Sequence, residues 1–155
     1  MTVTKVISGG QCGADIAGLR AAKRLGLQTG GWMPKGFRTL NGLRPEYAEQ
    51  YGLVETESEQ YPPRTKRNVQ QSDGTIRFAE NFNTAGERCT LKYIREFNKP
   101  NMDVWINNEI VRQWQVIKWL HDNDIHILNV AGNARFEIEG FVENYLLEVL
   151  RVPGL

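Results

Sequence analysis

Short apolar runs alternate with stretches of helical periodicity along most of the chain. The first run, residues 3–8, is rich in β-branched residues and ends at glycines, which is typical of a central strand. Residues 14–25 then place apolar side chains at helical spacing, and Gly26 ends that segment. The chain is therefore predicted to begin as a strand–turn–helix unit.

The same alternation recurs to the end of the chain. Further strands are predicted at 28–32, 74–79, 102–106 and 125–130, and further helices at 64–71, 88–97, 109–120 and 136–151. One of these helices is expected to bury four apolar side chains, Ile110, Val111, Trp114 and Ile117. Strand followed by helix, five times over, predicts an α/β, three-layer, Rossmann-like fold with a mainly parallel five-stranded sheet. No linker or repeat divides the chain, so residues 1–155 are expected to form a single domain.

One segment departs from the alternation. Residues 33–60 contain prolines and glycines at short intervals and show no clear period. A loop of that length inside a compact domain is unusual, and such loops often act as functional lids. We therefore expect an irregular segment that closes over a site.

Composition narrows the classes of partner. The net charge of +1 gives no support for a nucleic-acid polymer, and no apolar run is long enough to cross a membrane. The two cysteines, Cys12 and Cys89, lie far apart, which favours a reducing, cytoplasmic compartment. The spacing of His, Cys and Asp predicts no metal site, and no required cofactor is expected.

The strongest chemical signal is the glycine-rich turn between the first strand and the first helix. Glycines let backbone N–H groups approach a ligand closely, and a helix N-terminus favours negative charge. The turn therefore predicts a phosphate cradle, formed by Gly9, Gly10, Gln11, Cys12, Gly13 and the following Asp15. The turn matches neither the GxGxxG motif nor a Walker loop, which argues against P-loop NTP hydrolysis. The alternative is a tight strand–helix turn that holds no ligand.

Three more candidate loops follow predicted strands. In the second loop, Lys35 and Arg38 are expected to contact phosphate oxygens and Trp32 to stack on a base or pterin ring, or else the loop is only a solvated basic segment. A third loop can form an anion nest or a plain helix cap, from Asn83, Gly86, Glu87, Arg88 and Thr90. The fourth offers Asn129 and Gly132, with the asparagine placed to recognise a polar ring edge. In parallel sheets such strand ends converge on one ligand site.

Cys12 is also a candidate nucleophile, because a helix N-terminus can lower a thiol pKa. A nucleophile needs a base beside it, and the two histidines are His121 at a predicted helix end and His126 inside a predicted strand. Both are interpreted as structural. The sequence therefore does not favour a catalytic cysteine, and it names no catalytic residue.

A family resemblance rests on four segments, residues 7–15, 30–36, 64–69 and 72–75. In this order and spacing they resemble the family known as putative molybdenum carriers, which are circularly permuted YpsA-like proteins of the SLOG superfamily. The resemblance implies a Rossmann-like fold related to the lysine-decarboxylase-like LOG proteins. It also implies a nucleotide-derived or pterin-derived ligand and a homo-oligomer, a dimer or a tetramer.

The chain departs from the pattern of that family at three places. The family usually has threonine where Cys12 stands and arginine where Ile16 stands. Its third glycine loop usually reads Gly-Gly-Thr-x-x-Thr, whereas residues 85–90 here keep the second glycine and the last threonine but have Glu87 in place of the middle threonine. An unchanged family ligand is therefore not implied.

Two functions from different classes follow. The first is a non-enzymatic protein that binds, carries or sequesters a phosphorylated nucleotide-derived molecule, for example a signal sponge in phage–host conflict or a molybdopterin carrier. The second is a LOG-like phosphoribohydrolase that cleaves an N-glycosidic bond, with Glu87 and Arg88, or Asp15, as suppliers of charge. The LOG-type Pro-Gly-Gly-x-Gly-Thr-x-x-Glu motif is missing, which favours the binding protein. A third reading, an interaction module with vestigial loops, predicts a closed pocket.

Overall fold

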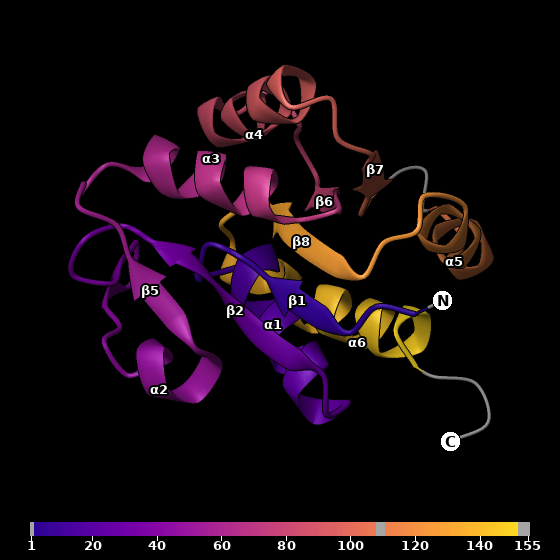
Figure 1. The fold of residues 1–155 in the computed structure, drawn as a ribbon, viewed down its shortest axis with the longest axis horizontal. Helices are drawn as coiled ribbons and strands as arrows, with labels where there is room; N and C mark the ends of the chain where they lie inside the picture. Colours follow the sequence, from indigo (N-terminus) through magenta and orange to yellow (C-terminus); the bar gives the residue numbers. More distant parts are fainter. Residues whose placement is uncertain (1, 108–110, 152–155) are drawn as a thin grey trace.

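The fold is a parallel sheet between two layers of helices (Figure 1). The computed structural model describes residues 2–107 and 111–151. Six strands form the main sheet in the order β5-β2-β1-β8-β6-β7, and every neighbouring pair is parallel. Their bounds are β1 Lys5–Ile7, β2 Gln28–Met33, β5 Leu53–Glu55, β6 Gly74–Ala79, β7 Asn101–Trp105 and β8 Ile127–Gly132.

Helices cover both faces of this sheet. On one face, α1 (Ala14–Arg24) packs on α6 (Glu139–Val149), which follows the short 3₁₀ turn η1 (Phe136–Ile138), and α5 (Gln113–Asp122) lies beside α6. On the other face, α3 (Tyr61–Gln71) packs against α4 (Ala85–Glu96) (Figure 1). The predicted three-layer, Rossmann-like α/β fold is confirmed. None of the helices in the described ranges is long and apolar enough to cross a membrane.

The expected five-stranded sheet has a sixth strand, which lies in the segment predicted to be irregular. That segment folds into the hairpin β3 (Arg38–Thr39) and β4 (Gly42–Leu43), the short helix α2 (Tyr47–Tyr51) and the strand β5. β5 pairs with β2 from Gly31 opposite Leu53. Its three residues are too few to show a period, so only the partner strand defines it. Residues 33–60 thus contain a short helix and three short strands of the scaffold rather than forming one irregular lid.

The helix near the end of the chain also differs from its prediction. It begins at Gln113, later than expected, and Trp114 and Ile117 are 61% and 47% exposed. The buried side instead carries Val116, with Trp119 packed partly against the core. α5 covers only the margin of the sheet, so one side of it has no layer to pack against. The Ile110 of the predicted buried set lies outside the described residues.

The order of the strands defines where a site can form. From β1 the chain proceeds through α1 to β2 on one side, whereas β8 is the neighbour of β1 on the other side. The direction of strand succession therefore reverses between β1 and β8. In sheets of this type, ligands bind beyond the carboxyl ends of the strands at such a reversal.

Candidate functional site

A cavity of about 630 Å³ lies at this reversal, beyond the ends of β1, β8 and β6 and bordered by α3 and α4. Its volume is in the range of pockets that hold a nucleotide-sized molecule. Eight residues singled out from the sequence line it, namely Gly9, Gln11, Asp15, Gly86, Glu87, Thr90, Asn129 and Gly132. Three of the four candidate loops thus meet at one hollow beyond the ends of the strands.

The glycine-rich turn contributes shape rather than open donors. A Cβ on Gly9 would lie 1.6 Å from Nη1 of Arg64, so this position needs glycine for the guanidinium to pack against the turn. Gly10 faces away from the cavity, because a Cβ there would meet Met33 and Leu53 in the core. These glycines serve close packing in the protein's own interior.

The N–H groups of this turn donate to acceptors of the protein itself. Gly10 N donates to Ser8 Oγ, and Gln11 N donates to Asp15 Oδ2 at 3.3 Å. Cys12 N donates to the Gln11 side chain, and Gly13 N donates to Glu139 Oε2 at 2.9 Å. With these donors already paired, the geometry favours the tight-turn interpretation of residues 9–13 over a phosphate cradle.

A buried ion pair lies beside this turn. Arg64 Nη1 donates to Asp15 Oδ2 at 3.0 Å, and the two side chains are 12% and 8% exposed. Burial raises the pKa of Asp15, although Arg64 and the Gln11 N–H both act to lower it. The guanidinium also lies over the ring of Tyr61, 5.1 Å from its centroid. The pair gives this part of the cavity wall no net charge.

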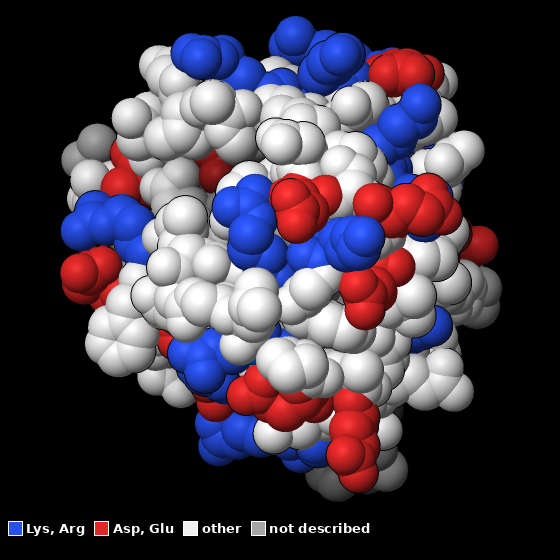
Figure 2. Space-filling view, turned by 90° about the vertical axis from the view of Figure 1, so that its left-hand side faces the viewer, with Lys and Arg blue, Asp and Glu red and all other residues white. Residues whose placement is uncertain are grey.

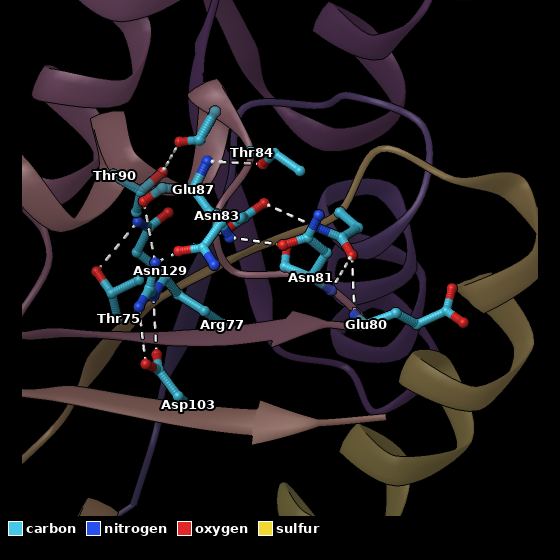
Figure 3. Close-up of polar contacts among 12 residues, drawn as sticks. Thr75, Arg77, Glu80, Asn81, Asn83, Thr84, Glu87, Thr90, Asp103 and Asn129 are labelled. Carbon is cyan, nitrogen blue, oxygen red and sulfur yellow. Dashed lines mark hydrogen bonds and ion pairs between the residues drawn. The ribbon is translucent and has the colours of Figure 1, made fainter. Parts of the chain in front are cut away.

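Glu87 is the second buried carboxyl group of the cavity wall (Figure 3). It is the third residue of α4, and its N–H donates to the helix-capping Thr84 Oγ1. Its Oε2 accepts a 3.3 Å hydrogen bond from Asn133 Nδ2, whereas its Oε1 has no hydrogen-bond partner among the described residues. Burial raises the pKa of Glu87 to about 7, against the lowering effect of Arg77.

Arg77, which the sequence did not single out, supports Glu87 from β6. Its guanidinium donates to both carboxylate oxygens of Asp103 on β7, at 2.8 and 2.7 Å, and its Nη1 donates to the Glu87 carbonyl (Figure 3). The same Nη1 lies 3.9 Å from Glu87 Oε1. Arg77 therefore interacts with both carboxyl groups, and its contacts with Asp103 are shorter than its contact with the Glu87 carboxyl.

Asn133 connects the loops after β6 and β8. Its Oδ1 accepts hydrogen bonds from the N–H groups of Glu80 and Asn81, and its Nδ2 donates to the Asn81 carbonyl as well as to Glu87. This organising role was also not predicted. Its only signal in the sequence was an asparagine directly after Gly132 at a strand end.

The first turn of α4 adds free backbone donors to the wall, where the Tyr61 hydroxyl and Arg64 Nε also have no hydrogen-bond partner among the described residues. Ala85 and Gly86 are exposed and line the cavity. Neither N–H finds an acceptor within the described ranges. A Cβ on Gly86 would meet nothing within 4 Å, so there is open space in front of this turn. The Thr84 cap leaves these two N–H groups unpaired, so with the helix dipole they are a candidate seat for an anion.

Asn129 and Thr90 are polar residues of the cavity wall whose side chains donate to other groups of the protein. The side chain of Asn129 on β8 donates to Thr75 Oγ1 at 3.2 Å, and Thr90 Oγ1 donates to the Gly86 carbonyl at 3.1 Å (Figure 3). Gly132 is close to β6, since a Cβ there would lie 2.0 Å from the Phe78 carbonyl oxygen. The end of β8 is thereby held tightly against β6.

The second candidate loop lies outside the cavity wall. The Trp32 ring lies beneath the Arg67 guanidinium, and its Nε1 donates to the side chain of Gln71. Lys35 is exposed, and Arg38 donates to the Glu59 carbonyl. Trp32 and Arg38 therefore do not line the cavity themselves, although the Arg38 guanidinium lies over the ring of Tyr61, which does.

Asn83, Arg88 and Cys12 are also absent from the cavity wall. Arg88 is exposed and donates to the Asn83 carbonyl on its own loop. Cys12 lines a separate hollow of about 150 Å³, and its thiol donates to the Ala134 carbonyl. Burial and the nearby Glu139 raise the pKa of Cys12, so the thiol is held in its protonated form. The geometry gives Cys12 no nucleophilic role.

Charges of both signs are mixed around the site. The charged residues that line the cavity are Asp15, Arg64, Glu80, Glu87 and Arg135. Arg135 pairs with Glu80, as Arg64 does with Asp15. Figure 2, which views the molecule from the left-hand side of Figure 1, likewise shows Lys and Arg interspersed with Asp and Glu. In the described part of the chain, no group of three or more His, Cys, Asp and Glu side chains is placed to hold a metal.

Comparisons with known proteins cover nearly the whole chain. The circularly permutated YpsA SLOG family matches residues 6–150. A crystal structure at 1.45 Å resolution of a putative molybdenum carrier protein from Syntrophus aciditrophicus SB is similar with a TM-score of 0.85 and 32% sequence identity. The similarity covers 97% of this chain and 96% of that chain. No curated protein matches.

Proposed function

The chain belongs to the circularly permuted YpsA SLOG family, and from this premise we propose that it binds a phosphorylated, nucleotide-derived small molecule, which it carries or sequesters without transforming it. The observation that carries the proposal is the cavity at the strand reversal, whose wall includes two unpaired N–H groups in the first turn of α4. A ligand of that class offers both an anion for the turn and a larger body for the rest of the hollow.

The phosphate is assigned to α4 rather than to the glycine-rich turn. The N–H groups of Ala85 and Gly86 are free, whereas those of residues 10–13 are already paired. Two aligned N–H groups at a helix N-terminus provide both the hydrogen bonds and the favourable dipole that phosphate oxygens require. This assignment moves the predicted cradle from the first candidate loop to the third.

The remainder of the cavity suits a ring and its polar edge. Leu40, Tyr61 and Pro62 supply apolar and aromatic surface, and Asn129 supplies an amide. A few placed polar groups on a largely apolar wall are typical of small-molecule sites. Base or pterin rings both fit this description, so a nucleotide and a molybdopterin share the same predicted contacts.

A carboxylate placed in the anion seat tests the assignment. Gly86→Asp puts negative charge at the second position of α4, where it favours the helix but competes with phosphate. We expect isothermal titration calorimetry to show binding of nucleoside monophosphates to the wild type and at least about a tenfold loss in Gly86→Asp. The parent nucleosides, which lack the phosphate, should bind both proteins equally.

Gly140→Asp is the matched control. Gly140 is the second residue of α6, it is exposed, and a Cβ there meets nothing within 4 Å. The control therefore makes the same change at another helix N-terminus, away from the residues that line the cavity. Equal losses in the two variants, or no nucleotide binding by the wild type, would refute the proposed function.

Glu87 favours one second candidate, the phosphoribohydrolase. A buried carboxyl with a pKa of about 7 can exchange a proton at neutral pH, which is the property of a general acid–base group. Chromatography can monitor whether the protein releases free base from nucleoside monophosphates. Release by the wild type that is abolished in Glu87→Gln would establish this reaction. If the nucleotide stays intact after prolonged incubation, the hydrolase is refuted and only the binding function stands.

Mass spectrometry of protein purified from cells separates the ligand classes. A co-purified nucleotide supports sequestration of a signal, and a co-purified pterin supports the carrier function named for the similar Syntrophus protein. Native masses from the same experiment also test the predicted dimer or tetramer.

A further inference from the structure

The cavity has more negative than positive groups in its wall. Two arginines, Arg64 and Arg135, face three carboxyl groups, and each arginine is already paired with one of them. The third carboxyl belongs to Glu87. Strongly charged phosphates are usually held by unpaired Arg or Lys side chains, and no such side chain lines this cavity within the described residues.

The Glu87 carboxyl lies at the helix turn that offers the anion seat. Ala85, Gly86 and Glu87 are the first three residues of α4, so the carboxyl and the free N–H groups fall within about one helical turn, roughly 5 Å along the axis. The Glu87 side chain is 5% exposed. Solvent therefore screens its interaction with a bound anion only weakly.

The groups that face Glu87 leave its charge largely uncompensated. From β6, Arg77 is nearest, but it gives its two side-chain bonds to Asp103 on β7. From the loop after β8, Asn133 donates one hydrogen bond of 3.3 Å. From α1, Asp15 adds negative charge, and Arg64 on α3 pairs with that carboxylate. An ionised Glu87 thus adds one net negative charge directly behind the seat.

We propose that Glu87 makes the cavity selective for phosphate esters with a single negative charge, such as phosphodiesters, over terminal phosphates with two. The inference rests on the proposed function and names its ligand class. The two free N–H groups satisfy the oxygens of either ligand equally, so the difference arises from repulsion between the carboxylate and the second phosphate charge. Glu87 thereby acts as a specificity-determining residue.

The same repulsion gives the selectivity a pH dependence. The pKa of Glu87 is about 7, so the carboxyl is mostly neutral at about pH 6 and mostly ionised at about pH 8. The preference for the monoanionic ester is expected at the higher pH and should shrink at the lower pH. A phosphate monoester also loses its second proton near pH 6, and a variant without the carboxyl isolates that contribution.

The test compares adenosine 5′-monophosphate with its phosphate methyl ester, which differs by one charge. Calorimetry at about pH 8 should show the wild type binding the ester at least about tenfold more tightly than the monophosphate. Glu87→Gln, which keeps an oxygen for Asn133, should reduce that ratio to within about threefold. Glu96→Gln removes an exposed charge from the other end of the same helix and should retain the wild-type ratio.

The possible results separate the inference about Glu87 from the proposed binding function. A wild type that binds both ligands equally, or a ratio that Glu87→Gln leaves unchanged, overturns the inference while nucleotide binding stands. If the wild type binds neither ligand, the proposed function and the inference are overturned together. If Glu87→Gln does not fold, the wild-type ratio at about pH 7 and pH 8 provides the test, because the monophosphate is mostly doubly charged at both values while Glu87 still titrates. An unchanged ratio is then the contrary result.

Discussion

Glu87→Gln is expected to stabilise the folded protein, and to do so more at high pH than at low pH. The pKa of this carboxyl is 4.5 in the reference state and about 7 in the fold, because burial penalises the charged form. Between these values the folded state holds a proton that the unfolded chain has lost. The stability of the wild type therefore decreases as pH rises through this range, whereas glutamine does not titrate.

The size of the effect follows from the two pKa values. Their difference corresponds to about 3 kcal/mol of unfolding free energy, fully present below pH 4.5 and lost above pH 7. Between about pH 5.5 and pH 8, the part that is lost is about 2 kcal/mol. The side chain is 5% exposed, so solvent screening reduces this figure little. The stability advantage of glutamine over glutamate should grow by that amount across the interval.

Urea unfolding at the two pH values measures the effect directly. Far-ultraviolet circular dichroism gives the unfolding free energy of wild type and variant, and the m-value should stay constant between them. Glu96→Gln, at the exposed far end of α4, should shift the stability equally at both pH values. A difference between Glu87→Gln and the wild type that is the same at about pH 5.5 and pH 8 would refute the assigned burial of the charge.

Three other substitutions test the scaffold of the site by urea unfolding. Arg64→Met leaves the buried Asp15 carboxylate unpaired and should lower the unfolding free energy by about 3–5 kcal/mol. Adding Asp15→Asn should restore most of that loss, and effects that simply add in the double variant would contradict the ion pair. Gly18→Ala brings a Cβ to 2.7 Å from the Val130 side chain and should cost about 1–3 kcal/mol, so an unchanged midpoint would contradict the close α1–β8 contact. Asn68→Ala removes two hydrogen bonds to the backbone of β2 and should cost about 2–3 kcal/mol; a neutral result would place that side chain elsewhere.

The elements with a clear period could be predicted from the sequence. The strand at 74–79 has the predicted bounds, and α1 differs from its predicted range by one residue. Each is a local pattern, because alternation or helical spacing reports which side of a segment is buried. β5 and the start of α5 have no such pattern, and their limits depend on the neighbours that they pack against. Those neighbours lie far away in the chain.

The site was partly predictable for the same reason. Parallel strands bring their carboxyl ends together, so the candidates after β1, β6 and β8 could be placed at one edge. Arg64 and Asn133 could not be assigned roles, because their partners are distant in sequence. Arg64 lies 49 positions from Asp15, and the partners of Asn133 lie at least 46 positions away. The second loop also failed to reach the cavity, since Trp32 and Arg38 found partners outside it. Side-chain pairing of this kind has no local signature.

The two helix N-termini at the strand reversal differ in their unpaired donors, and this is why we propose the anion site at α4 rather than at α1. At α1, the chain supplies its own anion, because Glu139 on α6 accepts the hydrogen bond of Gly13 N and pairs with Arg20. The glycines there permit close packing, and a second anion would meet that carboxylate. At α4, the cap is the neutral Thr84, which takes one N–H and leaves two. Each of these turns has a glycine at or beside the helix N-terminus, so composition alone predicts an anion at each. The N–H groups are paired at α1, whereas two are unpaired at α4, and this difference is why we propose α4 for the anion.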